Sequence, residues 1–355
     1  MTKNSYLAIG QMSGTSLDGL DLAAVEFEKN HSSWHYRWVA TETLPYPAVW
    51  EDQLRNAPNL PANELMELHA AYGHYLGDTL ASFLHTHNLT PDIIACHGHT
   101  VFHRPERGYS TQIGDGWPIA YATNSLTATD FRTADIALGG QGAPLVPIGD
   151  ELLFGNYSHC LNLGGFSNVS FRENNQRVAF DICPVNLVLN AFARKQGVPY
   201  DKEGALGRQG TVNSTMLQKL NALPFYEQKM EAKSLGKEWL DKAFMPVVEA
   251  FDLTLPDTMA TLYEHMGMQI GKSLQHTGEG QTLVTGGGAY NTYLLKRIKA
   301  YTTAKLEVPD NRLVDYKEAL IFAFMGVLRL RNEINCLASA TGAARSSCCG
   351  TLHIP

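Results

Sequence analysis

The sequence predicts an α/β protein built from a duplicated domain. Two segments about 150 residues apart, residues 9–27 and 159–171, each contain an apolar strand, a glycine turn with small polar residues, and a second apolar strand. A third short strand at residues 283–285 precedes three glycines and a predicted helix. We therefore expect two lobes, residues 1–150 and 151–355, each of which offers one hairpin to a shared cleft, and packing of the terminal helices back on the first lobe is an alternative.

Composition agrees with two cores and limits the partners. The chain has 355 residues, of which 44% are hydrophobic and 18% charged, enough for two domains of ordinary size. Its net charge of −7, without a long basic run, argues against nucleic acid or an anionic membrane as a partner. No apolar stretch approaches the roughly 20 residues that span a bilayer. The first residues lead into a strand rather than a signal peptide, so we expect a cytoplasmic protein.

The turn of the first hairpin suits an anion. Asp18 and Gly19 form a typical hairpin turn pair in which glycine supplies a positive φ. Backbone amides and hydroxyls around residues 13–16 are donors for phosphate oxygens, and Asp18 or Asp21 is a candidate to hold magnesium through water. For this segment alone, an ordinary solvated turn is an equal alternative.

The remaining elements follow in order along the chain. Apolar residues at helical spacing predict a long amphipathic helix over residues 63–84. Glycine and proline at residues 139–147 predict a loop and a lobe boundary. In the second lobe, the sequence predicts further helices at residues 186–193, 258–274 and 316–330.

Three histidines follow an apolar strand at residues 93–95. His97, His99 and His103 are spaced like metal ligands, but they stand at the carboxyl end of a strand, where ligands gather in α/β proteins. We favour substrate contact over metal ligation, because a neutral imidazole binds hydroxyl groups.

Five strings of residues together resemble one known family. The chain is similar to anhydro-N-acetylmuramic acid kinases of the actin, sugar kinase and heat shock ATPase superfamily, from about residue 6 to about residue 345. The strings are GQMSGTSLDGLD at 10–21, DFR at 130–132, ALGGQGAPLVP at 137–147, NLGG at 162–165 and TGGGAYN at 285–291. The resemblance implies a two-lobed, actin-like fold of duplicated ribonuclease H-like domains with an interlobe cleft. It also suggests a homodimer.

The resemblance implies roles for individual residues. ATP with Mg²⁺ would lie against the three glycine turns, with metal supplied through the nucleotide rather than by a set of protein ligands. The residues expected at the nucleotide are Gly14, Thr15, Ser16, Leu17, Asp18, Gly19, Leu20, Asp21, Gly164, Gly165, Gly286, Gly287 and Gly288. Those expected at an amino sugar are His97, His99, Thr100, Gln112, Asp130, Arg132 and Asn186. Arg132 is a candidate for the sugar's lactyl carboxylate, and a salt bridge to Asp130 or Asp135 is the alternative.

Asp181 is the candidate general base. It follows the predicted strand at residues 177–180, and the family's matching aspartate activates water. Water would then attack the anomeric carbon, open the 1,6-anhydro bridge and free O6 to take the γ-phosphoryl of ATP, giving N-acetylmuramate 6-phosphate in peptidoglycan recycling. A helix N-cap is the alternative role for this aspartate.

The chain departs from the family's pattern at two places. Residues 181–186 read Asp-Ile-Cys-Pro-Val-Asn where Asp-Thr-Gly-Pro-Gly-Asn is usual, and Asn190 replaces a common aspartate. His99 stands where glutamine is usual. Without the glycines, Cys183 and Val185 must keep a negative φ or pack against a reshaped wall. Two alternatives therefore stay open: a kinase of the same mechanism for another anhydro or simple sugar, and an actin-like nucleotide-binding protein without sugar transfer.

Overall fold

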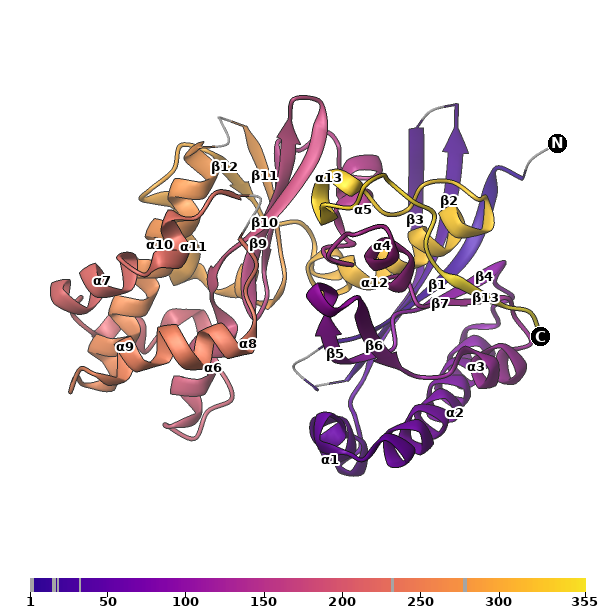
Figure 1. Ribbon diagram of the computed structural model, residues 1–355. Coiled ribbons are helices and arrows are strands. Elements are labelled where there is room, and N and C mark those ends of the chain that lie inside the picture. Colours follow the sequence, from indigo (N-terminus) through magenta and orange to yellow (C-terminus); the bar gives the residue numbers. More distant parts are fainter. Residues whose placement is uncertain (1–2, 15–16, 18, 32, 231–232, 277–279) are drawn as a thin grey trace. The chain divides into compact units, whose positions relative to one another are not determined.

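A computed structural model describes residues 3–355 except 15–16, 18, 32, 231–232 and 277–279 (Figure 1). The chain forms two compact units, residues 1–154 with 316–355, and residues 155–315. Each unit has its own sheet. The predicted lobes, residues 1–150 and 151–355, remain a proposal. The two units divide the chain near the predicted boundary, and residues 316–355 group with the first unit.

The first unit contains a six-stranded sheet in the order β13-β7-β4-β1-β2-β3 and a separate hairpin of β5 and β6. Its strands are β1 (Ser5–Ser13), β2 (Leu20–Asn30), β3 (Ser33–Leu44), β4 (Ile93–Cys96), β5 (His99–Arg104), β6 (Tyr109–Ile113), β7 (Thr127–Thr129) and β13 (Thr351–His353). Its helices are α1 (Ala48–Asn56), η1 (Ala57–Asn59), α2 (Ala62–His87), η2 (Pro105–Arg107), α3 (Gly116–Thr123), α4 (Thr133–Ala137), α5 (Pro147–Leu152), α12 (Asn311–Leu330) and α13 (Ala338–Thr341).

The second unit contains a five-stranded sheet in the order β10-β9-β8-β11-β12. Its strands are β8 (His159–Leu163), β9 (Phe166–Glu173), β10 (Gln176–Pro184), β11 (Gln281–Thr285) and β12 (Lys305–Glu307). Its helices are α6 (Asn186–Arg194), η3 (Lys202–Gly204), η4 (Gly207–Gln209), α7 (Ser214–Asn221), η5 (Pro224–Glu227), α8 (Lys237–Trp239), η7 (Leu240–Phe244), α9 (Met245–Glu249), α10 (Leu255–His276), η8 (Gly287–Tyr290) and α11 (Thr292–Lys299).

The two sheets repeat one topology. In the first, β1, β2 and β3 are antiparallel neighbours, while β4 and β7 continue parallel on the other side of β1. In the second, β8, β9 and β10 are antiparallel and β11 and β12 continue parallel beside β8. Counted along the chain within each sheet, both have the strand order 3-2-1-4-5, and the first sheet adds β13 beside β7. The predicted α/β class with duplicated, actin-like domains is confirmed.

Helices cover both faces of the first sheet because side chains alternate along β1. Ile9 joins the apolar core beneath α2, where Tyr72, Leu76 and Leu80 recur at helical spacing and are fully buried. Gly10 faces the other way, toward α12. The predicted helix at residues 63–84 is thus confirmed as α2, which ends at Asn88 with a left-handed φ of 50°.

Other predicted elements are present with shifted ends. The helices predicted at residues 186–193, 258–274 and 316–330 correspond to α6, α10 and α12, and the last begins five residues earlier, at Asn311. The strand predicted at residues 177–180 continues to Pro184, so Asp181 lies inside β10 rather than after it. A bulge separates Asp181 from Cys183 in the pairing with β9.

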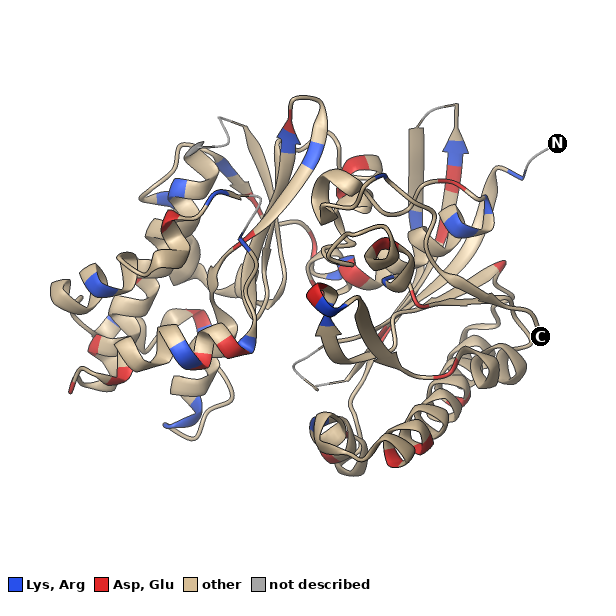
Figure 2. Cartoon of the chain, in the orientation of Figure 1, with Lys and Arg blue, Asp and Glu red and all other residues tan. Residues whose placement is uncertain are grey.

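Charge is spread over both units, and Figure 2 shows acidic residues without basic ones along α2. Among the helices that the structure describes, none is long and apolar enough to cross a membrane.

Packing at Gly10 generates a stability prediction. A Cβ there would lie 1.8 Å from the carbonyl oxygen of Ala319 and 2.7 Å from the amide nitrogen of Ala323, both backbone atoms of α12. Neither can move without shifting the helix, so Gly10→Ala should cost about 3 kcal/mol or more. Differential scanning calorimetry should show a Tm several degrees lower. Gly287→Ala, whose Cβ meets only ordinary contact at 3.6 Å, is the control. A Gly10→Ala protein as stable as this control would contradict the packing described.

Candidate active site

The turn between β1 and β2 differs from the predicted geometry. Among its described residues, Leu17 takes the left-handed φ of 59°, and its N–H donates to the carbonyl of Gly14 at 3.3 Å. Gly19 has no positive φ, so that prediction is wrong. Its lack of a side chain is needed for close approach instead, because a Cβ would lie 2.5 Å from the Leu44 carbonyl oxygen. Thr15, Ser16 and Asp18 lie outside the described residues.

Two predicted nucleotide residues, Leu20 and Asp21, lie at the start of β2. Leu20 is fully buried, so only its backbone can face a ligand. Asp21 is partly exposed, and its Oδ1 accepts a hydrogen bond from the Thr43 hydroxyl at 2.6 Å. Carboxylate oxygens of this kind are suitable partners for magnesium-bound water.

Arg132 and His97 meet at the carboxyl ends of β7 and β4. The Arg132 guanidinium donates through Nη2 to His97 Nε2 at 2.7 Å and through Nη1 to the Gly142 carbonyl at 2.7 Å. Its Nε lies buried without a protein partner. The loop that carries Gly142 is held by the buried Asp135 carboxylate, which accepts from the Gly142 N–H at 2.8 Å and from the Thr341 hydroxyl at 2.8 Å.

His97 is a neutral acceptor in this pair. Its Nδ1 bonds the Gly98 carbonyl at 2.9 Å, which requires a proton on Nδ1 and leaves Nε2 free to accept from Arg132. Burial, and then the Arg132 charge, lower the pKa of His97 to about 3. The expected salt bridges from Arg132 to Asp130 or Asp135 are replaced by hydrogen bonds to an imidazole and a carbonyl.

Three further predicted sugar residues, His99, Thr100 and Gln112, lie on the hairpin of β5 and β6. His99 Nδ1 lies 3.3 Å from the Ser13 hydroxyl at the end of β1, and burial lowers the pKa of His99 to about 4. Gln112 donates through Nε2 to the Thr100 hydroxyl at 3.3 Å. Two pairs of predicted residues, Gln112 with Thr100 and Arg132 with His97, are therefore in direct contact within this unit, and His99 contacts the end of β1.

A cavity of about 330 Å³ in the first unit brings three predicted residues together. His97, Gln112 and Asp130 line it, with His69 from α2 and His353 from β13. Asp130 has a left-handed φ of 52°, and its Oδ1 accepts from the Thr133 N–H at 3.1 Å. Neither His69 nor His353 was predicted as a site residue. His69 was interpreted as a packing or surface residue of its helix, and the strand that brings His353 here pairs residues more than 200 positions apart.

Glu318 is a charged neighbour that the sequence analysis missed. It lies partly buried on α12, close enough to Arg132 and Lys317 for their charges to affect its pKa, which burial raises. The signal available was a charged pair, Lys317 and Glu318, directly before the apolar run at residues 319–328.

In the second unit, the hairpin of β8 and β9 and the turn after β11 are in contact. Gly286 has a φ of 80°, and a Cβ there would lie 2.3 Å from Asn162 Oδ1. A Cβ on Gly288 would lie 2.7 Å from Leu163 Cβ. Gly164 follows directly in the hairpin turn. Two of the three predicted glycine elements thus form one surface.

Asn186 joins these two turns at the start of α6. Its Nδ2 donates to the Leu163 carbonyl at 3.0 Å, and its N–H donates to the Gly164 carbonyl at 3.2 Å. The carbonyl of Gly165 accepts from the Val185 N–H at 2.8 Å. Asn186 therefore supports the glycine turns as well as offering a group to a ligand.

The residues that replace the usual glycines pack into the core. Cys183 and Val185 are fully buried in the apolar cluster of the second unit, and Val185 has a φ of −129°. This outcome agrees with the expectation of negative φ and a reshaped wall. The helix N-cap position is occupied by Val185, so Asp181 is not a cap.

Asp181 is a partly buried carboxylate at the edge of the second sheet, because β10 is the outermost strand. Its Oδ2 accepts from the Leu235 N–H at 2.8 Å. Burial raises its pKa to about 6, and the Leu235 hydrogen bond acts in the opposite direction. The group is thus mostly ionised at neutral pH yet basic enough to take a proton.

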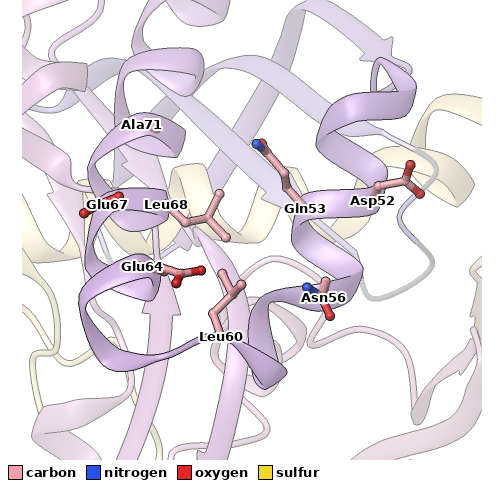
Figure 3. A pocket seen from close by; sticks show the side chains of 8 residues that line it. All are labelled: Asp52, Gln53, Asn56, Leu60, Glu64, Glu67, Leu68 and Ala71. Carbon is pink, nitrogen blue, oxygen red and sulfur yellow. The ribbon is translucent and has the colours of Figure 1, made fainter.

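A larger hollow elsewhere has unsuitable chemistry for phosphate. It measures about 570 Å³ and lies between α1 and α2 (Figure 3). Asp52, Glu64 and Glu67 line it, and none of its lining residues was predicted as a site residue. Within the described chain, no cluster of three His, Cys, Asp or Glu side chains is arranged to hold a metal.

The raised pKa of Asp181 predicts a pH-dependent stability difference. Its folded pKa of about 6 exceeds the ordinary 3.8, so the folded state binds the proton more tightly, and this carboxyl costs stability progressively from about pH 4 to pH 6 and fully above. Asp181→Asn carries no such charge. Its Tm should equal the parent's near pH 4 and exceed it above pH 6.

Thermal melts from pH 4 to pH 8 measure this difference. Asp252→Asn, at an exposed position of the same unit, is the control, and its Tm difference from the parent should not increase between pH 4 and pH 6. A Tm difference between Asp181→Asn and the parent that stays constant across the range would refute the raised pKa.

Comparison with known proteins identifies the family. The profile of the family described as "Anhydro-N-acetylmuramic acid kinase" matches residues 6–355. A curated relative of that name from Pasteurella multocida is 35% identical, and the match covers 99% of this chain and 98% of the relative. Relatives of the same name from Gloeobacter violaceus and Vibrio cholerae are 34% and 32% identical, each with 98% of both chains covered. The chain belongs to the anhydro-N-acetylmuramic acid kinase family.

Proposed function

We propose that this protein is an ATP-dependent kinase that opens the 1,6-anhydro bridge of 1,6-anhydro-N-acetylmuramic acid and phosphorylates O6. The product is N-acetylmuramate 6-phosphate, formed in the recycling of peptidoglycan. The observation that carries the proposal is the family match over residues 6–355, with nearly the whole length of each relative covered. The protein is an enzyme, a phosphotransferase.

The reaction combines a hydrolysis with a phosphoryl transfer. A water molecule gives one proton to the Asp181 carboxylate while its oxygen bonds to C1 of the sugar. The C1–O6 bond breaks, and its electron pair stays on O6. O6 then bonds to the γ-phosphorus of ATP as the bond to the ADP oxygen breaks. The sum is anhydro sugar, water and ATP giving sugar 6-phosphate, ADP and a proton.

Asp181 suits the role of base through its environment. A general base works best when its pKa lies near the working pH, and burial places the pKa of Asp181 near 6. The Leu235 N–H occupies Oδ2 and leaves Oδ1 for the water. Asp181 is therefore proposed as the catalytic residue.

The glycine turns are proposed to hold the nucleotide. Gly14, Thr15, Ser16 and Gly19 would bind the terminal phosphates, with Gly164 and Gly165 from the second hairpin and the turn at residues 286–288 beside the remainder of ATP. Mg²⁺ neutralises charge on the phosphates when it is bound. The donor chemistry of Asp21 fits a partner for magnesium-bound water, as Asp18 would by its residue type.

Arg132 and His97 are proposed to recognise the sugar. The Arg132 Nε lies buried without a protein partner, and an N–H of a charged guanidinium is a strong donor for a carboxylate. The cavity lined by His97, Gln112 and Asp130, at about 330 Å³, has the volume of a small-molecule site. His99 and Thr100, with Asn186 from the second unit, complete the proposed sugar contacts.

Two expectations belong to the same proposal. The resemblance suggests a homodimer, and a kinase that consumes ATP to recycle a cell-wall sugar is expected in the cytoplasm. Size-exclusion chromatography with light scattering tests the first.

Replacing the base should separate binding from turnover. Asp181→Asn keeps shape and can still accept from Leu235, but it loses the basic oxygen, so formation of sugar phosphate should fall by about 10² to 10⁴. Isothermal titration calorimetry should still detect binding of ATP and of the anhydro sugar to the Asp181→Asn protein. ADP release and sugar phosphate should fall together, because O6 becomes a nucleophile only as the ring opens. Asp252→Asn is the control and should keep the parent's turnover. Near-normal turnover by Asp181→Asn would mean that another group is the base.

Substituting Arg132 should change specificity rather than activity alone. Arg132→Lys keeps the charge but removes the Nε donor, so affinity for 1,6-anhydro-N-acetylmuramic acid should fall about tenfold or more. Inhibition by 1,6-anhydro-N-acetylglucosamine, which lacks the lactyl carboxylate, should change little. Equal losses for both sugars would assign Arg132 to holding the Gly142 loop instead.

A further inference from the structure

We propose that residues 233–235 form a backbone clamp that fixes the Asp181 carboxylate in an ionised, water-facing position, with Lys233 as the positioning residue that anchors the clamp. The inference rests on the proposed function in so far as Asp181 is the base. The name backbone clamp is used below for residues 233–235 alone.

The clamp holds Asp181 at two points. The Asp181 N–H donates to the Lys233 carbonyl at 3.1 Å, and the Leu235 N–H donates to Asp181 Oδ2 at 2.8 Å. Since β10 is an edge strand, its outward backbone groups need partners from outside the sheet. The same short segment therefore satisfies the main chain of Asp181 and restrains the rotation of its side chain.

The bulge in β10 marks the place where the clamp acts. Asp181 pairs with Asn168 of β9, and the register shifts before Cys183 pairs with Ser167. Bulges redirect side chains and interrupt regular pairing. The backbone clamp thus contacts β10 at the residue where the pairing of β10 with β9 becomes irregular.

Lys233 anchors the clamp to the body of the second unit. Its ammonium donates to the Tyr226 carbonyl at 3.3 Å and lies 5.8 Å from the ring centroids of both Phe180 and Phe225. Partial burial lowers its pKa. A cation between two aromatic rings and a carbonyl has few alternative positions, so the main chain that carries it is also restricted.

Tyr226, which accepts from Lys233, is itself held by a chain of hydrogen bonds. The Tyr226 hydroxyl donates to His265 Nε2 at 2.8 Å, and His265 Nδ1 donates to Asn221 Oδ1 at 2.8 Å. His265 is fully buried, and burial lowers its pKa to about 3, so it stays neutral at physiological pH. These bond directions therefore do not change across the pH range of the test.

Among the residues that the structure describes, four titratable groups lie near Asp181 on the elements around it. Lys233 comes from the clamp, Cys183 from the same strand and Tyr226 from η5, with His265 behind Tyr226. Across the ladder, β9 presents the uncharged Asn168. Burial raises the pKa values of Cys183 and Tyr226, so both stay neutral near pH 7. Asp181 is then the group whose titration the clamp controls.

The test is the pH profile of kcat/KM for Lys233→Met. Loss of the anchor should weaken the Leu235 hydrogen bond, which favours the ionised carboxylate, and should raise the acidic pKa of the profile from about 6 to about 7. One such unit means about fivefold less activity at pH 6 and almost none lost at pH 8.5. Lys237→Met, which removes an equal charge four residues away from an exposed pair with Asp241, should keep the parent profile.

Two further variants separate the possible failures. Lys233→Arg, which keeps the cation, should restore most of the parent profile. If Asp181→Asn is inactive but the Lys233→Met profile coincides with the parent's, the clamp is wrong and the base assignment stands. If Asp181→Asn retains turnover, the proposed function of Asp181 fails. A loss in Lys233→Met that is equal at every pH would also overturn the clamp.

Hydrogen exchange of the wild-type protein tests the clamp without any variant. The Leu235 amide should be strongly protected, because it donates to Asp181 Oδ2, and protection should decrease as the carboxylate is protonated below pH 6. Exchange at the rate of an unstructured peptide at neutral pH would overturn the proposal even if Lys233→Met failed to fold.

Discussion

A carboxylate that acts as a base near neutral pH must be partly withdrawn from water and still be ionised. Withdrawal raises the pKa, and a hydrogen bond to the ionised form lowers it. In this protein the two effects meet at Asp181, where burial is opposed by the Leu235 N–H. The edge strand, its bulge and the backbone clamp all meet at this one residue.

The duplicated topology explains why glycine turns occur at equivalent places. In each sheet the first two strands form an antiparallel hairpin, and the fourth strand runs parallel to the first. The second unit adds a glycine turn after that fourth strand, and Gly286 and Gly288 come into contact with the hairpin residues Asn162 and Leu163. The first unit instead carries His97 at the end of its fourth strand, β4. Under the proposed function, the position after the fourth strand would face the nucleotide in the second unit and the sugar in the first.

The sequence predicted the elements whose signal is local. Period, glycine turns and apolar runs located α2, α10 and both hairpins, since helical spacing and turn chemistry act within a few residues. The sequence analysis explained Gly19 by a positive φ, whereas the structure requires glycine there for close approach to Leu44. That contact could not be predicted locally, because it depends on a strand more than twenty residues away. The sequence analysis placed Asp181 after its strand, since nothing local marks the bulge. Tertiary packing brings His353 to the cavity of the first unit, Glu318 near Arg132 in the same unit, and Leu235 to Asp181 in the second unit, and none of the three was predicted as a site residue.

The central claim is that the environment of Asp181 makes it a base. Carbon-13 NMR of protein labelled at aspartate carboxyl carbons, titrated from pH 3 to pH 9 and compared with Asp181→Asn to assign the resonance, measures its pKa directly. The structure predicts a titration near pH 6, well above an ordinary aspartate. A titration near pH 4 would show that burial does not raise the pKa of this carboxyl above that of an ordinary aspartate, and it would contradict the account.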